Sequence, residues 1–284
     1  MGFIGSVFSP WYRWSGRRNP ANHVCLNVAT YGPGGRFTMT DRGETTLHQS
    51  RSELSIGPSA MRWEGDRLIV EVNEVSSPPL ISRVRGHITV TPSAVTDREL
   101  CLTPDGAHIW RPFAPTAHVE VDLGKRAQWQ GEGYFDANFG TRALEADFSY
   151  WTWGRYPLAD GTACFYDAVR RDGTHLASGF RFHADGRSER LETLPPLQRL
   201  PRSLWAVMRE TRGDAGSRPK TALSMLDAPF YCRSAVTTRI DGYETTGVHE
   251  ALDLDRFRGP WLMPMLAVRV PRRARWNQSR PARS

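Results

Sequence analysis

Short segments in which apolar and polar residues alternate recur along most of this chain, and turn residues separate them. The segments Leu68–Asn73, Arg85–Thr91 and His118–Leu123 all follow this pattern. A period of two residues is typical of a β-strand with one buried face. Two later segments, 162–170 and 178–183, each lead into a turn that contains Asp-Gly, which is the pattern of a β-hairpin. The sequence therefore predicts a series of antiparallel strands.

Glycine and proline leave little room for long helices. The 284 residues include 25 Gly and 20 Pro, spread along the chain, and both residue types interrupt helical segments. We therefore expect an all-β fold built from antiparallel barrels or sandwiches. A single barrel rarely needs this many strands, so we expect two consecutive domains, residues 1–125 and 126–284.

Basic residues are in excess, and they are concentrated near the C-terminus. The formal net charge of +7 favours anionic partners, such as a polyanion or an acidic membrane surface. The apolar segment Trp261–Val270 is too short to cross a bilayer, which needs about 20 residues. An arginine-rich tail containing Trp276 follows it. The two segments together are typical of attachment to a membrane surface. The alternative is that the apolar segment is a core strand and the tail is its frayed end. The tail arginines are Arg272, Arg273, Arg275, Arg280 and Arg283.

Several common functions lack their usual signatures. The sequence has no Rossmann glycine pattern, Walker loop, GxSxG or HExxH motif, and its eight His residues are scattered. We therefore expect no cofactor and no metal. No zinc-finger or RNP-type pattern is present, so we expect no nucleic-acid partner. A basic β-barrel that stacks single-stranded bases on aromatic side chains remains an alternative.

The cysteines and the N-terminus indicate the compartment. The four cysteines are widely spaced, which favours free, mostly buried thiols in a reducing environment. The N-terminus has neither a basic region nor a long apolar region of the kind that starts a signal peptide. We therefore expect a cytoplasmic protein. If the apolar segment and the arginine-rich tail bind a membrane surface, the protein would be attached peripherally to the inner membrane.

Two segments combine polar groups in a way that is unusual for ordinary strands. Residues two apart on a strand share a face, so His108 and Trp110 would lie together. By the same rule, Tyr134, Asp136 and Asn138 would line one face of another strand. These residues are candidates for catalysis. Alternate polar residues are also typical of a solvated face, and a buried histidine is often structural.

The sequence resembles the carotenoid 1,2-hydratase family, also called hydroxyneurosporene synthases, through motifs that follow one another in order over the whole chain. These are Gly2–Tyr12, Asn22–Ala29, Ile56–Ala60, His108–Pro112, Gly133–Gly140, Tyr150–Arg155, Leu204–Trp205, Ala228–Tyr231, His249–Leu252 and Asp255–Phe257. Family members carry a Trp-rich segment and an early strand before the first motif. We therefore expect either an upstream start codon or an N-terminal domain that lacks its first strand.

The resemblance implies two lipocalin-like (calycin-type) β domains and a cofactor-independent hydro-lyase of carotenoid biosynthesis in a photosynthetic bacterium. It implies that the partners are an acyclic carotenoid, such as neurosporene or lycopene, and water, at the inner photosynthetic membrane. It also implies catalytic roles for His108, Trp110, Tyr134 and Asp136. A carotenoid- or lipid-binding calycin protein without catalysis is the alternative.

These residues fit an acid-catalysed hydration of the terminal C1=C2 bond. We expect Asp136 to be a protonated carboxyl that delivers the proton, because burial raises the pKa of a carboxyl. His108 would hydrogen-bond Asp136 or the attacking water and would take up the proton afterwards. Trp110 would stabilise the cation with its π face. Tyr134 would add π stabilisation or position the water through its hydroxyl, and Asn138 would help to hold the water.

Overall fold

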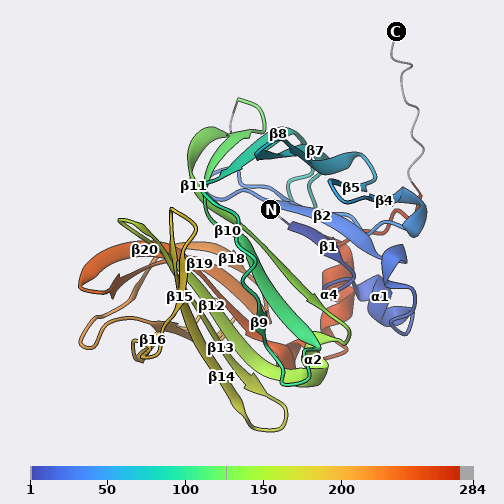
Figure 1. Cartoon of the computed structure of the whole chain (residues 1–284). Coiled ribbons are helices and arrows are strands. Elements are labelled where there is room, and N and C mark those ends of the chain that lie inside the picture. The colour runs from blue at the N-terminus through green and yellow to red at the C-terminus, as the bar shows by residue number, and fades with distance from the viewer. Residues whose placement is uncertain (1, 126, 276–284) are drawn as a thin grey trace. The chain divides into compact units, whose positions relative to one another are not determined.

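The computed structural model describes residues 2–125 and 127–275 of the chain (Figure 1). Over these residues almost all regular structure is antiparallel β-strand, and the helices are short. The all-β prediction is therefore confirmed. The alternating segment Leu68–Asn73 lies in a strand whose apolar side chains Leu68, Val70 and Val72 are buried. The Asp-Gly turns are also present, with positive φ at Gly173 and Gly186.

The chain forms two compact units whose segments alternate along the sequence. Unit 1 contains residues 1–91, 118–132 and 263–284, and unit 2 contains residues 92–117 and 133–262. The units therefore do not follow the predicted division into 1–125 and 126–284. Residue 125 lies in the turn between two long strands, β10 (His108–Asp122) and β11 (Gln128–Gly140). Each of these strands contributes residues to both units, which a reading of loops along the sequence does not reveal.

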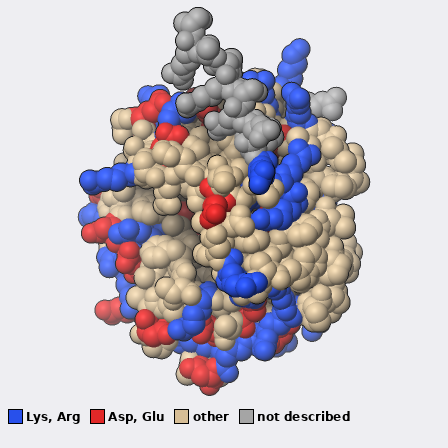
Figure 2. Space-filling model, turned by 90° about the vertical axis from the view of Figure 1, so that its right-hand side faces the viewer, with Lys and Arg blue, Asp and Glu red and all other residues tan. Residues whose placement is uncertain are grey.

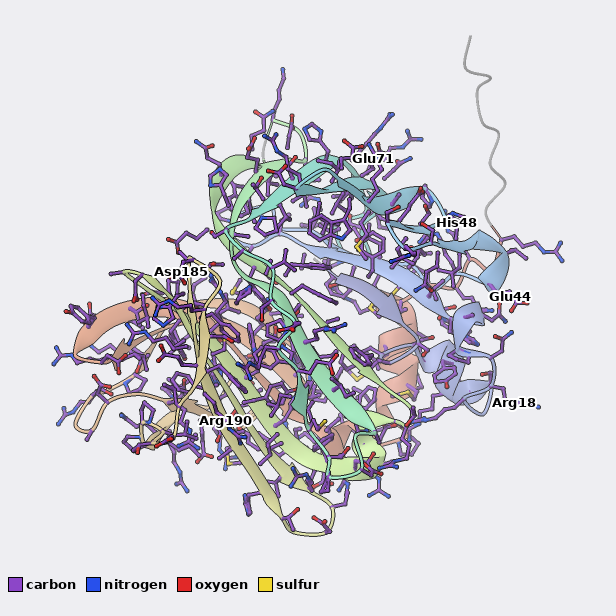
Figure 3. All side chains as sticks on the ribbon, in the orientation of Figure 1. Arg18, Glu44, His48, Glu71, Asp185 and Arg190 are labelled. Atoms are coloured by element: carbon purple, nitrogen blue, oxygen red, sulfur yellow. The ribbon has the colours of Figure 1, made fainter. Side chains whose placement is uncertain are left out.

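Unit 1 contains a three-stranded sheet and much of a larger one. The small sheet has the order β1-β2-β3 and consists of β1 (Gly2–Gly5), β2 (Val24–Ala29) and β3 (Phe37–Met39). The larger sheet has the order β11-β10-β8-β7-β6-β5-β4. Its remaining strands are β4 (Leu47–Gln49), β5 (Glu53–Ile56), β6 (Ser59–Glu64), β7 (Arg67–Val75) and β8 (Arg83–Pro92). Figure 3 labels the exposed side chains of His48 on β4 and Glu71 on β7, and that of Glu44 in the short helical turn Glu44–Thr46 before β4.

The apolar segment near the C-terminus is a helix, so the expectation of a core strand there is wrong. Helix α4 spans Leu262–Arg269, and its proline, Pro264, lies in the first turn, where it is tolerated. Met265 and Val268 are 42% and 62% exposed, although Met263 is buried. No helix within the described ranges is long and apolar enough to cross a membrane. Trp276, Arg280 and Arg283 lie outside the described residues.

The segment after α4 is bound to the start of unit 1. The Arg272 guanidinium donates to the buried carboxylate of Asp41 and, over 3.0 Å, to the carbonyl oxygen of Asn22. Trp11, on helix α1 (Pro10–Trp14), donates its indole N–H to the carbonyl oxygen of Val270 over 2.7 Å. These bonds place α1 next to the end of α4.

Unit 2 is built on a seven-stranded antiparallel sheet with the order β15-β14-β13-β12-β20-β19-β18. Its strands are β12 (Phe148–Leu158), β13 (Gly161–Arg170), β14 (His175–His183), β15 (Ser188–Arg190), β18 (Lys220–Asp227), β19 (Tyr231–Ile240) and β20 (Tyr243–Asp253). The smaller elements are β9 (Leu100–Cys101), which pairs with β10, the pair β16 (Leu197–Leu200) and β17 (Arg209–Arg212), and helices α2 (Leu144–Asp147) and α3 (Leu254–Phe257).

The two faces of this sheet have different partners. Residues that pair directly across an antiparallel ladder lie on one face, so the register identifies both sets. We call the face that carries Trp153, Tyr166 and Glu250 the aromatic face. Its other members, from the same registers, are Trp151, Arg155, Cys164, Ser178, Phe180, Phe182, Arg233 and Leu252. The opposite face packs Tyr156, Phe165 and Val236 against Leu200 of β16.

The excess of basic residues is visible on the surface, and the cysteines are free thiols, as the sequence predicted. Lys and Arg side chains cluster on part of the face drawn in Figure 2, beside a wide surface without charge. All four cysteines are free thiols. Cys25, Cys164 and Cys232 are buried, and Cys101 is exposed.

Candidate active site

Asp136 lies on β11 at the centre of an aromatic cluster in unit 2. Its carboxylate oxygen Oδ2 accepts a hydrogen bond from the indole Nε1 of Trp110 over 2.8 Å. Burial raises the pKa of Asp136 to about 6, and the negative charge of Glu250 acts in the same direction. The hydrogen bond from Trp110 and the positive charge of Arg233 oppose this rise. At neutral pH, roughly a tenth of such a carboxyl is protonated, so it can act as a general acid.

Trp110 is the most enclosed of the predicted residues, with 1% of its surface exposed. It projects from β10, and its ring centre lies 5.9 Å from that of Tyr166 and 6.1 Å from that of Phe180. Phe182 is at 6.4 Å in an edge-on arrangement. These three rings fix the indole, so its N–H remains directed at Asp136.

Tyr134 lies two residues before Asp136, and its side chain contacts the aromatic face. The ring centre of Tyr134 lies 5.1 Å from that of Trp153. The guanidinium carbon of Arg155 lies 5.4 Å from the ring centre of Tyr134. Arg155 in turn donates to the carbonyl oxygens of Pro115 and Gly133. Since the guanidinium already contacts this π system, Trp110 and Trp153 are better placed to stabilise a second cation.

A half-buried ion pair lies on the same face. Arg233 and Glu250 are opposite each other on β19 and β20, with 3.2 Å between Nε and Oε1, and each keeps 21% exposure. Both affect the pKa of Asp136. The pair therefore belongs to the electrostatic environment of the acid.

His108 has a different partner from the one expected. Its Nε2 lies 2.7 Å from Oδ2 of Asp147, at the end of α2. Arg142 donates to both carboxylate oxygens of Asp147, over 3.0 Å each. Of the two partners expected for His108, Asp136 and the attacking water, the first is corrected, because Trp110 supplies the bond to Asp136. His108 is buried at 3% exposure and shares the buried face of β10 with Trp110, as the two-residue spacing predicted.

The backbone of β11 passes close to His108. A Cβ atom on Gly140 would lie 2.6 Å from Nδ1 of His108 and 2.6 Å from the carbonyl oxygen of Ala107. Only glycine allows this approach without a shift of the strand. Asn138, two residues before Gly140, is exposed, in contrast to Tyr134 and Asp136.

Sequence reasoning thus selected four residues and missed several neighbours. Trp153, Tyr166, Arg233, Glu250 and Asp147 all contact or influence the predicted set. The segments Tyr150–Arg155 and His249–Leu252 were noted as motifs, which was a usable signal. The register of β12, β13 and β20 was needed to show that Trp153, Tyr166 and Glu250 share one face.

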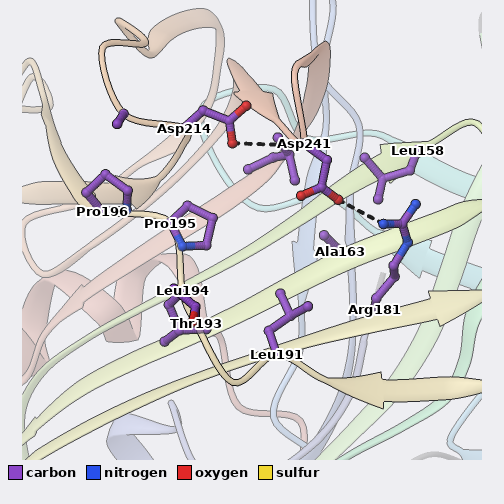
Figure 4. Close-up of a pocket in the computed structure, with 12 residues that line it drawn as sticks. Leu158, Ala163, Arg181, Leu191, Thr193, Leu194, Pro195, Pro196, Asp214 and Asp241 are labelled. Carbon is purple, nitrogen blue, oxygen red and sulfur yellow. Dashed lines mark hydrogen bonds and ion pairs between the residues drawn. The ribbon is translucent and has the colours of Figure 1, made fainter.

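One pocket among the described residues lies away from Asp136. It has a volume of about 260 Å³, and Ala163, Arg181 and Ile240 are among its lining residues (Figure 4). The Arg181–Asp241 ion pair and Leu191 lie at the same pocket. Its strand residues belong to the opposite face of the seven-stranded sheet. Asp136, a carboxyl with a raised pKa that is bonded to an indole, is therefore the candidate site.

Comparison with known proteins gives consistent relatives. The family described as "Carotenoid hydratase CrtC" matches residues 1–279. A protein from Cereibacter sphaeroides, named acyclic carotenoid 1,2-hydratase, is 66% identical over 279 residues, which are 98% of this chain and 100% of that protein. Proteins of the same name from Rhodobacter capsulatus and Thiocapsa roseopersicina are 57% and 45% identical. They match over 98% and 96% of this chain, and over 99% and 68% of their own lengths.

A solved structure supports the fold. It is a protein described as AttH from Nitrosomonas europaea, and its TM-score is 0.53 at 13% identity, over 81% of this chain and 86% of that one. At this identity, the likeness shows a shared lipocalin-like β architecture and carries no statement about activity.

Proposed function

The chain belongs to the carotenoid hydratase CrtC family, and we propose that it adds water across the C1=C2 bond at the end of an acyclic carotenoid. The observation that carries this proposal is Asp136, a carboxyl whose pKa burial raises to about 6, set among aromatic rings and bonded to Trp110. An alkene is a very weak base, so its protonation requires a carboxylic acid of which an appreciable fraction stays protonated near neutral pH.

The reaction balances with one acid and one water molecule. The protonated carboxyl of Asp136 gives its proton to C2, and the two π electrons form the new C2–H bond. A tertiary cation remains at C1. The oxygen of water bonds to C1, and the proton that it loses returns to the Asp136 carboxylate. The acid is then regenerated, so we propose a hydro-lyase type of reaction that requires no cofactor.

The aromatic rings would stabilise the cation while it exists. A cation over the face of an indole gains about 2 kcal/mol or more when both are desolvated. We propose this role for Trp153, whose ring contacts Tyr134, and for Trp110, whose indole N–H is bonded to Asp136. Tyr134 contributes mainly by positioning, because its ring contacts both Trp153 and the Arg155 guanidinium.

His108 would act mainly through the structure around it. His108 contacts Asp147, and Asp147 in turn contacts Arg142. These contacts fix the first residue of β10, which lies two residues before Trp110. We therefore propose His108 as a positioning residue. The uptake of a proton by His108 stays a prediction, tested below against Asp147.

We also propose peripheral attachment to the cytoplasmic side of an inner membrane, where a carotenoid would be dissolved. In unit 1, Met265 and Val268 of α4 are exposed, and so is Trp14 of α1, at 52%. Exposed Arg18 lies near Trp14 along the chain. Apolar side chains combined with arginines favour an anionic lipid surface.

Flotation with vesicles tests this attachment. The protein should float with vesicles that contain phosphatidylglycerol and less with purely zwitterionic vesicles. The variants Val268→Ser and Trp14→Ser should float less with both. Equal flotation of the variants and the wild-type protein would contradict this surface, and failure of the wild-type protein to float would contradict attachment altogether.

The activity is tested by incubating lycopene in vesicles with the protein in ¹⁸O-labelled water. Chromatography and mass spectrometry should show a more polar product that carries one ¹⁸O atom. Asp136→Asn should give no product, because an amide does not supply the proton. The control is Asp167→Asn, on the opposite face of the sheet and paired with Arg212, which should lower stability and retain hydration.

Two results would oppose the proposal. Product formation by Asp136→Asn near the wild-type rate would remove Asp136 as the acid. Wild-type protein that binds lycopene in a fixed ratio and never forms product would indicate a binding protein instead.

A further inference from the structure

Besides the hydroxyl of Ser178, three buried polar groups of aromatic side chains on the aromatic face lack a hydrogen-bond partner among the residues that the structure describes. They are the hydroxyl of Tyr166 and the indole N–H groups of Trp151 and Trp153. The three residues are 2%, 9% and 6% exposed. A buried polar group without a partner destabilises the fold, so a cluster of such groups within one region points to a polar ligand that binds there.

Tyr166 lies at the centre of this cluster. It is opposite Trp153 in the β12–β13 register, and its ring centre is 5.2 Å from that of Trp151. It is also 5.9 Å from Trp110, whose indole is bonded to Asp136. Tyr166 therefore contacts the rings around the acid from the sheet side.

The phenol stays neutral in this setting. Burial raises the pKa of Tyr166 well above its ordinary value, and the negative charge of Asp136 acts in the same direction. A neutral phenol is not a proton acceptor of useful strength. Its oxygen can accept one hydrogen bond from a water molecule, and its proton can be donated in another.

We propose that the hydroxyl of Tyr166 binds the water molecule that attacks C1 of the carotenoid, so that Tyr166 controls capture of the cation and Asp136 controls its formation. This inference rests on the proposed hydratase function. The phenol oxygen accepts one hydrogen of the water and leaves a lone pair of the water oxygen free for C1. After the C1–O bond forms, the released proton moves to the Asp136 carboxylate.

Formation of the cation and its capture by water can be told apart when capture fails. A cation at C1 that is not captured by water loses a proton to the Asp136 carboxylate, from C2 or from a terminal methyl group, and an alkene forms again. In D₂O, the acid is Asp136 with deuterium on its carboxyl, so each such cycle can leave deuterium at the end group of the recovered carotenoid. Hydration and exchange therefore report on different steps.

The experiment measures both in D₂O, with lycopene in vesicles. Tyr166→Phe should form hydrated product at least about tenfold more slowly than the wild-type protein, because the water is no longer positioned. The recovered lycopene should contain deuterium, and the ratio of exchange to hydration should rise by a similar factor. Asp136→Asn should show neither exchange nor hydration. Folding of Tyr166→Phe should be preserved, since the lost hydroxyl has no bond to a described residue.

Tyr156→Phe is the matched control. Tyr156 is a fully buried tyrosine of β12 on the opposite face, and its hydroxyl is bonded to that of Thr211. This variant should lose stability and keep the wild-type ratio of exchange to hydration. Tyr166→Phe that hydrates at the wild-type rate would overturn the inference. So would a loss of hydration without deuterium in the recovered lycopene, because Tyr166 would then act before the cation forms. If the wild-type protein shows neither reaction, the proposed function itself fails.

Discussion

The indole Nε1 of Trp110 donates a hydrogen bond to Oδ2 of Asp136 over 2.8 Å, and this bond opposes the effect of burial on the carboxyl. Burial favours the protonated acid, whereas the N–H group favours the carboxylate that remains after proton transfer. Trp110 therefore does more than offer a π face. In the proposed reaction it would also stabilise the carboxylate form of Asp136, which exists together with the carbocation.

Trp110→Phe tests this second role. The ring remains and the donor is lost, so the pKa of Asp136 should rise above about 6. The high-pH limb of the pH–rate profile should move to higher pH, and kcat at low pH should change less than it does in Trp110→Ala. The alanine variant should also unfold more easily, by about 3–5 kcal/mol, because it leaves a cavity in a packed cluster. A limb that stays in place or moves to lower pH would contradict the role of this bond.

Glu250→Gln tests the electrostatic effect of the neighbouring ion pair. The charge of Glu250 raises the pKa of Asp136, and Arg233 lowers it. Removal of the carboxylate should therefore lower the pKa of Asp136 and move the high-pH limb to lower pH. Glu244→Gln, at an exposed position on the same strand, should leave the limb unchanged. Equal profiles for the two variants would show that Glu250 does not act on the acid.

The pH dependence of stability gives an independent measure of the state of Asp136. The pKa of an aspartate is about 4 in an unfolded chain, and in the folded protein the pKa of Asp136 is raised to about 6. Between these values the folded protein holds the additional proton. The contribution of this carboxyl to stability is therefore complete below about pH 4 and is lost as the pH rises through about 6.

Asp136→Asn should remove this loss. Its melting temperature should exceed that of the wild-type protein at pH 8, and the difference should shrink towards pH 4. A difference that does not vary with pH would show that Asp136 is not held in its protonated form by the fold. Thermal unfolding followed by circular dichroism at several pH values provides the measurement.

Local patterns in the sequence predicted much of this arrangement. The two-residue period placed His108 with Trp110 and Tyr134 with Asp136, because the pleat of a strand fixes which side chains share a face. Asn138 follows the same period and is nevertheless exposed. The period gives the face of a strand and does not tell how far its covering layer extends.

The partners of these residues depend on contacts that are distant in sequence. His108 is 39 residues from Asp147, and Trp110 is 26 residues from Asp136. Several partners were equally compatible with the chemistry of His108, and only the placement of α2 selects Asp147. Similarly, the segment after Trp261 is apolar enough for a strand or a helix, and a short apolar segment does not decide between them by periodicity.

The His108–Asp147 contact leads to the last prediction. If His108 only positions β10, then His108→Gln and Asp147→Asn should lower kcat by similar factors, about tenfold each, because either change disrupts the same contact. The double variant should be little worse than either single variant, since the two residues act as one unit. The high-pH limb that reports on Asp136 should not move in any of the three.

The other role of His108 predicts a different result. If His108 takes up the proton from the attacking water, His108→Gln should lose far more activity than Asp147→Asn, in which the imidazole remains. Because the Cβ of Gly140→Ala would lie against His108 Nδ1, this fourth variant should reproduce the loss of the positioning variants while leaving both members of the pair intact.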